Sequence, residues 1–112
     1  METKNIVLAL HKALDEKFAR EIVLIDLREL TPIADFFVIA TGNNAPQLAA
    51  LSDVAEDFLK EHGVKLRHRE GVNSANWILL DFGEIVVHLF DKESRDYYNL
   101  ERTWGDAAII TP

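Results

Sequence analysis

The sequence has no cysteine, one methionine and no long apolar run. Without cysteine, the chain can form neither disulfides nor thiolate metal sites, which fits a reducing compartment. A membrane-spanning helix needs roughly 20 consecutive apolar residues, and no stretch of the chain approaches that length. The polar start, Met1 to Asn5, does not have the charged-then-apolar layout of a signal peptide. We therefore expect a cytoplasmic protein that does not enter a membrane.

Basic residues are also scarce, with 12 Lys and Arg against 19 Asp and Glu and a formal net charge of -7. Nucleic-acid affinity depends on clustered Lys and Arg that neutralise phosphates. The composition therefore argues against RNA or DNA as the main contact and is compatible with a basic protein partner. What the chain does have is 48% hydrophobic residues in 112 positions. That is enough for the core of a single domain over residues 1–112.

The spacing of apolar residues predicts an α/β domain. Helices are expected over 4–18, from 46 to Gly63, and from a cap at Asp91 or Ser94 to about 102. Thr3 is the expected cap of the first helix, with Phe18 on its apolar stripe, and 42–44 form a turn before the second. Strands are expected over 21–27, 35–41, 64–69, 76–81 and 84–90. The order α-β-β-α-β-β-β-α gives a mixed sheet of about five strands with flanking helices.

The last two predicted strands form a hairpin. If Phe82 and Gly83 are its loop, Asp81 lies opposite Glu84 and Trp77 opposite His88. Strand side chains alternate between faces, so one face of the hairpin is aliphatic and belongs to the core. Its members are Ile78, Leu80, Ile85, Val87 and Leu89.

The other face of the hairpin has an aromatic and aliphatic centre with an acidic border, which is the composition of a binding surface. Its centre consists of Trp77, Leu79, Val86, His88 and Phe90, and its border of Asp81 and Glu84. The alternative is a second helix layer that makes Trp77 part of a core. Opposed carboxylates repel each other, so we expect solvent or a cationic partner between the two acids.

The final predicted helix carries three aromatic residues. Tyr97, Leu100 and Trp104 lie along one helical stripe, and a stripe of this spacing predicts packing against the domain. Tyr98 points away from that stripe. An exposed tyrosine beside Glu101 is the better candidate for a contact with a partner.

Catalytic signatures are weak. The four histidines have no tight ligand spacing, and we expect neither a metal nor a cofactor. The strand-glycine-polar turn at Thr41-Gly42-Asn43 resembles that of a nucleotidyltransferase, which needs paired carboxylates for two metal ions. The one acid-x-acid pair, Asp91-Lys92-Glu93, follows a later strand. We expect no enzyme, and a degenerate nucleotide-binding protein remains the alternative.

Five sequence words occur in one order and together span nearly the whole chain. They are Asp35-Phe36-Phe37-Val38-Ile39-Ala40-Thr41-Gly42-Asn43, Glu70-Gly71, Trp77-Ile78-Leu79-Leu80-Asp81-Phe82-Gly83, Val86-Val87-His88-Leu89-Phe90 and Arg95-x-Tyr97-Tyr98-x-Leu100-Glu101-x-x-Trp104. Taken together, they closely resemble the ribosomal silencing factor family, also called iojap-like proteins. One departure follows Gly42, where many members have Ser-x-Arg-Gln and this chain has Asn44-Ala45-Pro46-Gln47.

The resemblance implies a nucleotidyltransferase-like fold without catalysis. It also implies binding to ribosomal protein fourteen of the large ribosomal subunit, on the face that meets the small subunit. That binding would block subunit joining and repress translation when nutrients are short. A role in large-subunit maturation and self-association as a homodimer are further implications.

The resemblance and the hairpin face together give one set of expected partner-binding residues. The set is Trp77, Leu79, Asp81, Val86, His88, Phe90, Tyr98 and Glu101. A self-associating module that uses the same face is the third reading of the sequence.

Overall fold

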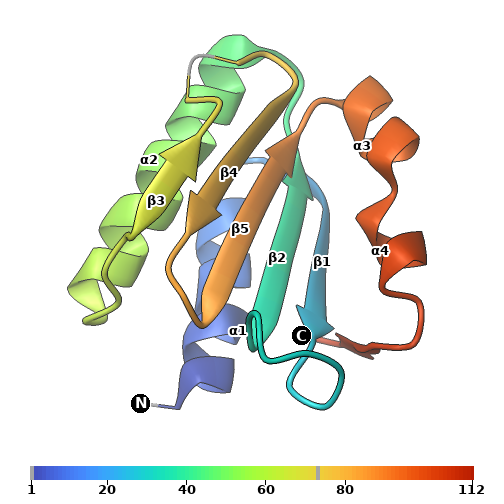
Figure 1. Cartoon of the computed structure of the whole chain (residues 1–112). Helices are drawn as coiled ribbons and strands as arrows, with labels where there is room; N and C mark the ends of the chain where they lie inside the picture. The colour runs from blue at the N-terminus through green and yellow to red at the C-terminus, as the bar shows by residue number, and fades with distance from the viewer. Residues whose placement is uncertain (1, 73) are drawn as a thin grey trace.

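The computed structural model describes residues 2–72 and 74–112 and contains one mixed sheet with helices on both faces (Figure 1). The six strands lie in the order β3-β4-β5-β2-β1-β6. Only β2 and β5 pair in parallel among the described pairings. The elements are α1 (Thr3–Asp15), β1 (Arg20–Asp26), β2 (Phe36–Thr41), α2 (Ala45–Glu61), β3 (His68–Glu70), β4 (Trp77–Asp81), β5 (Ile85–Phe90), α3 (Lys92–Tyr98), α4 (Leu100–Thr103) and β6 (Ala108–Ile110).

Helices α1 and α2 lie side by side behind the sheet and form the larger core with it (Figure 1). Each helix buries one apolar stripe, as its amphipathic pattern predicts. The strands contribute alternate residues to the same core. Its fully buried members include Val7, Leu10, Leu14, Leu48, Leu51, Leu59, Ile78, Leu80, Val87 and Leu89.

The limits of α2 follow the expected signals. The Asn44 side chain caps the helix by accepting a hydrogen bond from the Gln47 amide at 2.9 Å. The Gln47 side chain in turn accepts from the amide of Asn43, the residue before the cap, at 2.6 Å, so the two side chains satisfy one amide inside the helix and one just before it. Gly63 follows the helix with φ of +77°, a conformation that favours glycine.

The first helix is shorter than predicted. It ends at Asp15, and Phe18 lies in the following turn with φ of 67° and an exposed side chain, instead of on the apolar stripe. The chain reverses there to enter β1. Thr3 does not cap the helix, because Glu2 is the cap residue and the Thr3 hydroxyl donates to the Glu84 carboxylate at 3.1 Å.

The edges of the sheet also differ from the prediction. The expected strand over 64–69 is reduced to three residues, His68–Glu70, at one edge. At the other edge, Ala108–Ile110 adds a sixth strand that pairs with β1 and that the sequence did not reveal. The sheet therefore has six strands and not about five.

The β4–β5 hairpin has the predicted faces but a different register. Trp77 pairs with Phe90, and Asp81 pairs with Val86. Phe82 is buried and its amide bonds to the carbonyl of Ile85, so the loop is residues 83–84 and not 82–83. A register shift of two residues leaves every side chain on its original face.

The final helix is interrupted. Asn99 adopts a left-handed conformation with φ of 42°, which asparagine tolerates better than most residues, and it separates α3 from α4. The predicted stripe is therefore wrong for Tyr97, whose side chain is 80% exposed. Trp104 does pack against the sheet as expected, with its ring centroid 5.8 Å from that of Phe37.

Candidate partner-binding face

The second face of the sheet is only partly covered. The segment from α3 to β6 runs along the β1 side of the sheet (Figure 1), and its Leu100 and Trp104 pack on this second face. Among the described residues, no helix covers β4 and β3 on the same face. A second, smaller core lies beneath the covered part. It contains Ile25, Leu27, Ala34, Phe37, Ile39, Val86 and Phe90, with Val23, Trp77, Leu79, Leu100, Trp104 and Ala107 packed against it.

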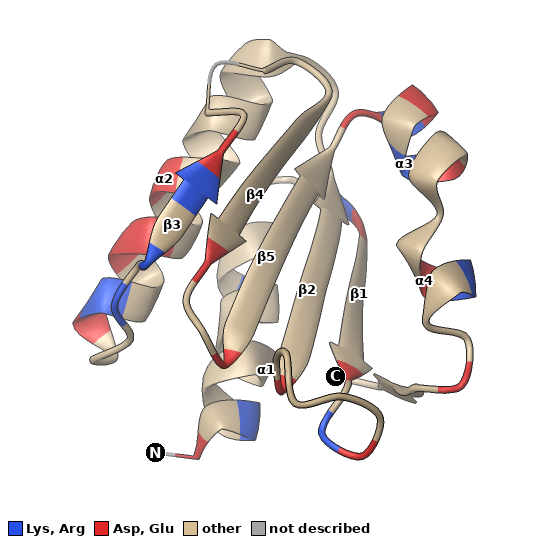
Figure 2. Cartoon of the chain, in the orientation of Figure 1, with Lys and Arg blue, Asp and Glu red and all other residues tan. Residues whose placement is uncertain are grey.

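Strand β4 marks the boundary between covered and open surface. Ile78 and Leu80 point toward the helices and are fully buried. Trp77 and Leu79, on the opposite face, are only half-buried. The central strands are almost free of charge, whereas β3 at the edge carries charged residues (Figure 2). The open part of the sheet therefore combines the apolar Trp77 and Leu79 with a polar border. We call the surface formed by His68, Glu70, Trp77, Leu79 and Asp81 the open face.

Trp77 is held by several aromatic neighbours. Its indole Nε1–H donates to Nδ1 of His88 at 3.2 Å. Its ring lies 4.9 Å from the ring of Phe90 and 4.5 Å from that of Tyr98, between centroids. A tryptophan that is fixed in this way has lost its conformational freedom before any partner binds, which lowers the entropic cost of association.

His88 is buried beneath Trp77 and has 4% of its surface exposed. Burial lowers the pKa of His88 to about 4, so the ring is neutral near pH 7. Because Nδ1 accepts the Trp77 hydrogen bond, the ring proton is assigned to Nε2, which has no hydrogen-bond partner among the described residues. His88 therefore orients Trp77 and supplies no positive charge to the surface.

The other predicted contact residues of β5 are buried as well. Val86 and Phe90 lie on the same face as Trp77 but have little or no exposed surface. Phe37 packs against His88 at a centroid distance of 4.6 Å and completes the layer below Trp77. These side chains support the open face from beneath.

The polar border of the open face differs from the one that the sequence predicted. Asp81 pairs with His68 of the neighbouring strand β3. The Nε2 atom of His68 lies 3.1 Å from Oε1 of Glu70. One Asp81 oxygen accepts from the Gly83 amide at 2.7 Å and closes the hairpin turn. Glu84 instead bonds to Thr3 at the start of α1. Asp81 and Glu84 therefore do not face each other, and the expected repulsion between them is absent.

Glu101 forms an intramolecular ion pair at the protein surface, with its side chain 33% exposed. Its carboxylate pairs with the buried guanidinium of Arg95, with Nε to Oε1 at 3.2 Å. Arg95 also donates to the Thr41 hydroxyl at 2.8 Å and to the Glu21 carbonyl at 2.7 Å. Arg95 thus connects α3 to α4, β2 and β1. Sequence patterns do not predict this role, because only these partners distinguish Arg95 from an ordinary surface arginine.

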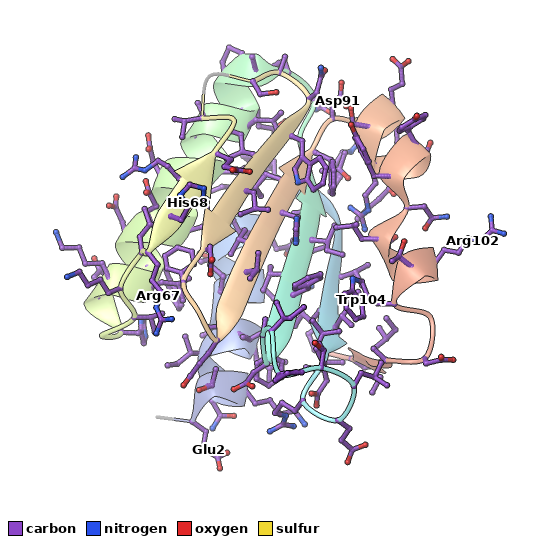
Figure 3. All side chains as sticks on the ribbon, in the orientation of Figure 1. Glu2, Arg67, His68, Asp91, Arg102 and Trp104 are labelled. Atoms are coloured by element: carbon purple, nitrogen blue, oxygen red, sulfur yellow. The ribbon has the colours of Figure 1, made fainter. Side chains whose placement is uncertain are left out.

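His68 and Trp104 lie on opposite sides of the second sheet face (Figure 3). The open face lies on the His68 side, and the part covered by the C-terminal segment lies on the Trp104 side. Tyr98 is 45% exposed and in contact with Trp77. The accessible predicted residues are therefore Trp77, Leu79, Asp81, Tyr98 and Glu101, and the Glu101 carboxylate is already paired with Arg95.

The family model described as "Ribosomal silencing factor during starvation" matches residues 1–112. The chain belongs to the ribosomal silencing factor family. It is 38% identical to the ribosomal silencing factor of Bacillus subtilis over 97% of this chain and 92% of that protein. It is 33% identical to the chloroplastic protein Iojap of Zea mays over 97% of this chain and 47% of that protein.

The structure of another bacterial protein agrees with this membership. The crystal structure of a Chromobacterium violaceum protein superposes with a TM-score of 0.88 at 35% identity, covering 94% of this chain and 88% of that one. The family name associates this silencing factor with the ribosome and with translation regulation.

The polar groups of the nucleotidyltransferase-like turn have structural partners in this silencing factor. Thr41 accepts from Arg95, and the Asn43 amide bonds to Gln47. Asp91 caps α3 by accepting from the Ser94 amide at 2.9 Å. Residues 2–72 and 74–112 hold no cluster of three or more His, Cys, Asp or Glu that could bind a metal ion. In the same residues, no helix is long and apolar enough to cross a membrane.

Proposed function

We propose that this protein represses translation in the cytoplasm by binding ribosomal protein fourteen of the large ribosomal subunit through the open face. Bound there, it occupies the surface that the small subunit needs, so joining of the subunits is blocked by steric exclusion. No bond is made or broken in this mechanism. The repression would operate when nutrients are short, and binding of the same subunit is compatible with a role in its maturation.

The observation that carries the proposal is the pair of Trp77 and Leu79, which remain only half-buried on the face that the C-terminal segment leaves open. Their neighbours Ile78 and Leu80 are fully buried against the helices. One face of β4 is therefore part of the core, and only its other face is accessible. Binding energy at protein interfaces is concentrated in a few aromatic anchors that are surrounded by less important contacts. A fixed, accessible tryptophan beside a leucine fits that role.

The predicted residues then have different tasks. Trp77, Leu79 and Tyr98 would contact the partner directly, and Asp81 would attract basic side chains. Glu70 adds a second carboxylate to the same border. The buried residues Val86, His88 and Phe90 would hold Trp77 in place, and Glu101 would act through Arg95 by fixing the segment that carries Tyr98.

The test is a sucrose-gradient profile of mixed ribosomal subunits with purified protein. We expect joined ribosomes to decrease and the protein to migrate with the large subunit. Trp77→Ala should lower affinity for the large subunit by about 30-fold or more, the loss typical of an anchor residue. Its circular dichroism should remain that of the native fold.

The matched control is Phe18→Ala, which removes an exposed aromatic residue from the turn after α1. This variant should repress subunit joining as well as the native protein does. Undiminished co-sedimentation of Trp77→Ala would refute the proposed surface.

Self-association through the open face is the second candidate. In a symmetric dimer, the half-buried Trp77 and Leu79 of one chain would pack against the same residues of the other chain. Light scattering with and without ribosomal protein fourteen separates the two ideas. A dimer that dissociates when the ribosomal protein is added supports repression, whereas a dimer that persists and never binds it supports a purely self-associating module.

A further inference from the structure

Tyr97 on α3 is the most exposed aromatic residue near the open face. Its side chain is 80% exposed, and its ring stands perpendicular to that of Tyr98 at a centroid distance of 5.0 Å. Tyr98 in turn contacts Trp77. The three rings therefore form one continuous aromatic strip that leads from the open face onto α3. We call Trp77, Tyr98 and Tyr97 the aromatic strip.

A carboxylate lies next to the outer end of this strip. Glu93 precedes Tyr97 by four residues on α3, and residues at this spacing are neighbours on a helix surface. Among the described residues, Glu93 is exposed and forms no ion pair. Asp96 is different, because it already binds Lys92 at 3.2 Å. The outer end thus combines an open aromatic ring with an uncompensated negative charge.

An aromatic face beside a carboxylate suits an arginine or lysine side chain. The cation is attracted to the ring face by its quadrupole and to the carboxylate by charge. A phosphate-bearing surface would be repelled by Glu93 and by the charge of -7 on the whole chain. The chemistry of the site therefore favours a basic protein segment over RNA.

We propose that Tyr97 and Glu93 extend the partner-binding surface onto α3 and bind an arginine or lysine side chain of the partner protein. This inference rests on the proposed function, because it takes the open face as the centre of the same interface. It adds a specificity site outside the sheet, at a residue that the sequence pattern assigned to packing.

The experiment measures the affinity of the full-length protein for purified ribosomal protein fourteen by calorimetry. We expect Tyr97→Ala to weaken binding about threefold to tenfold, from the loss of one exposed cation–π contact and its buried area. Tyr97→Phe should bind like the native protein, because the ring and not the hydroxyl makes the contact. Tyr97→Leu should bind more weakly than Tyr97→Phe, because it keeps apolar area but loses the ring face. Glu93→Gln should weaken binding and reduce its salt dependence.

Phe18→Ala is the control for loss of an equally exposed aromatic ring, since Phe18 and Tyr97 are both 80% exposed. Native-like binding by Tyr97→Ala would overturn the extension while a weakened Trp77→Ala still upheld the proposed function. Native-like binding by Tyr97→Leu would overturn recognition of a cation. A Tyr97-dependent affinity for protein-free ribosomal RNA, with no effect on the ribosomal protein, would overturn the choice of partner.

Discussion

The two faces of the sheet are made from the same strands but have different roles. On the helix-covered face, Ile78, Leu80 and Val87 have no exposed surface. On the other face, the C-terminal segment covers β1 and β2 and leaves Trp77 and Leu79 of β4 half-buried. The first face contains the larger core, and the second leaves part of its apolar surface uncovered. In the function that we propose, this uncovered part is the binding surface.

The sharpest test of this comparison uses two adjacent leucines. Leu80→Ala should lower the free energy of unfolding by about 2–5 kcal/mol, because it leaves a cavity in the core below α1 and α2. Leu79→Ala should cost about 1 kcal/mol, since Leu79 is partly exposed and its neighbours can relax into the space. Urea unfolding of both variants gives the two values.

The binding results for the same two variants should be reversed. Leu79→Ala should bind large subunits several-fold more weakly at a temperature where both variants are folded, whereas Leu80→Ala should bind normally. Equal stability losses, or a binding defect only in Leu80→Ala, would show that the two faces do not differ as described.

Arg95 tests how the covered part of the second face is held. Arg95→Ala should lower the free energy of unfolding by about 2–3 kcal/mol, because it removes a buried cation that binds Glu101, Thr41 and the Glu21 carbonyl. Limited proteolysis should then cut between α3 and β6 more readily. Arg102→Ala removes an exposed cation from α4 and should change stability by less than about 0.5 kcal/mol. An Arg95 variant as stable as the Arg102 variant would contradict this assignment.

His88 gives the second face a measurable dependence on pH. Burial lowers its pKa from 6.5 to about 4. The unfolded chain therefore binds more protons than the folded one between these values, so acid destabilises the fold. At pH 5 this single group should cost about 2 kcal/mol relative to pH 8. His88→Asn keeps an acceptor for Trp77 but does not titrate.

The measurement is urea unfolding of the native protein and of His88→Asn at pH 8 and pH 5. The native protein should lose about 2 kcal/mol more than the variant between the two pH values, because the carboxylates are common to both. Parallel losses would mean that His88 titrates at its ordinary pKa and is not enclosed.

Much of this division could be predicted from alternation in the hairpin. Alternation assigned Leu79 and Leu80 to opposite faces, and the structure confirms both assignments although the predicted loop position was wrong. The reason is that the correct register differs by two residues, which preserves the faces. The observed register pairs Asp81 with Val86 instead of Glu84, and the border of the open face includes β3.

Other features were missed. The helix break at Asn99 is local, because a left-handed residue there caps α4 through its side chain, but the 97–104 spacing suggested an unbroken stripe. Strand β6 is three residues long and is defined by its pairing with β1. The burial of Arg95 requires acceptors from three other parts of the chain. Strand β6 and the Arg95 contacts appear only when distant segments are placed together.

The most direct test of the open face is hydroxyl-radical footprinting of the protein alone and bound to large ribosomal subunits. Radicals oxidise accessible side chains, so the readout reports which face is covered, residue by residue. We expect oxidation of Trp77 and Tyr98 to fall several-fold on binding, while Phe18 in the turn after α1 reacts as before. Unchanged oxidation of Trp77 together with protection of Phe18 would show that the ribosome binds the helical side, and it would contradict the account.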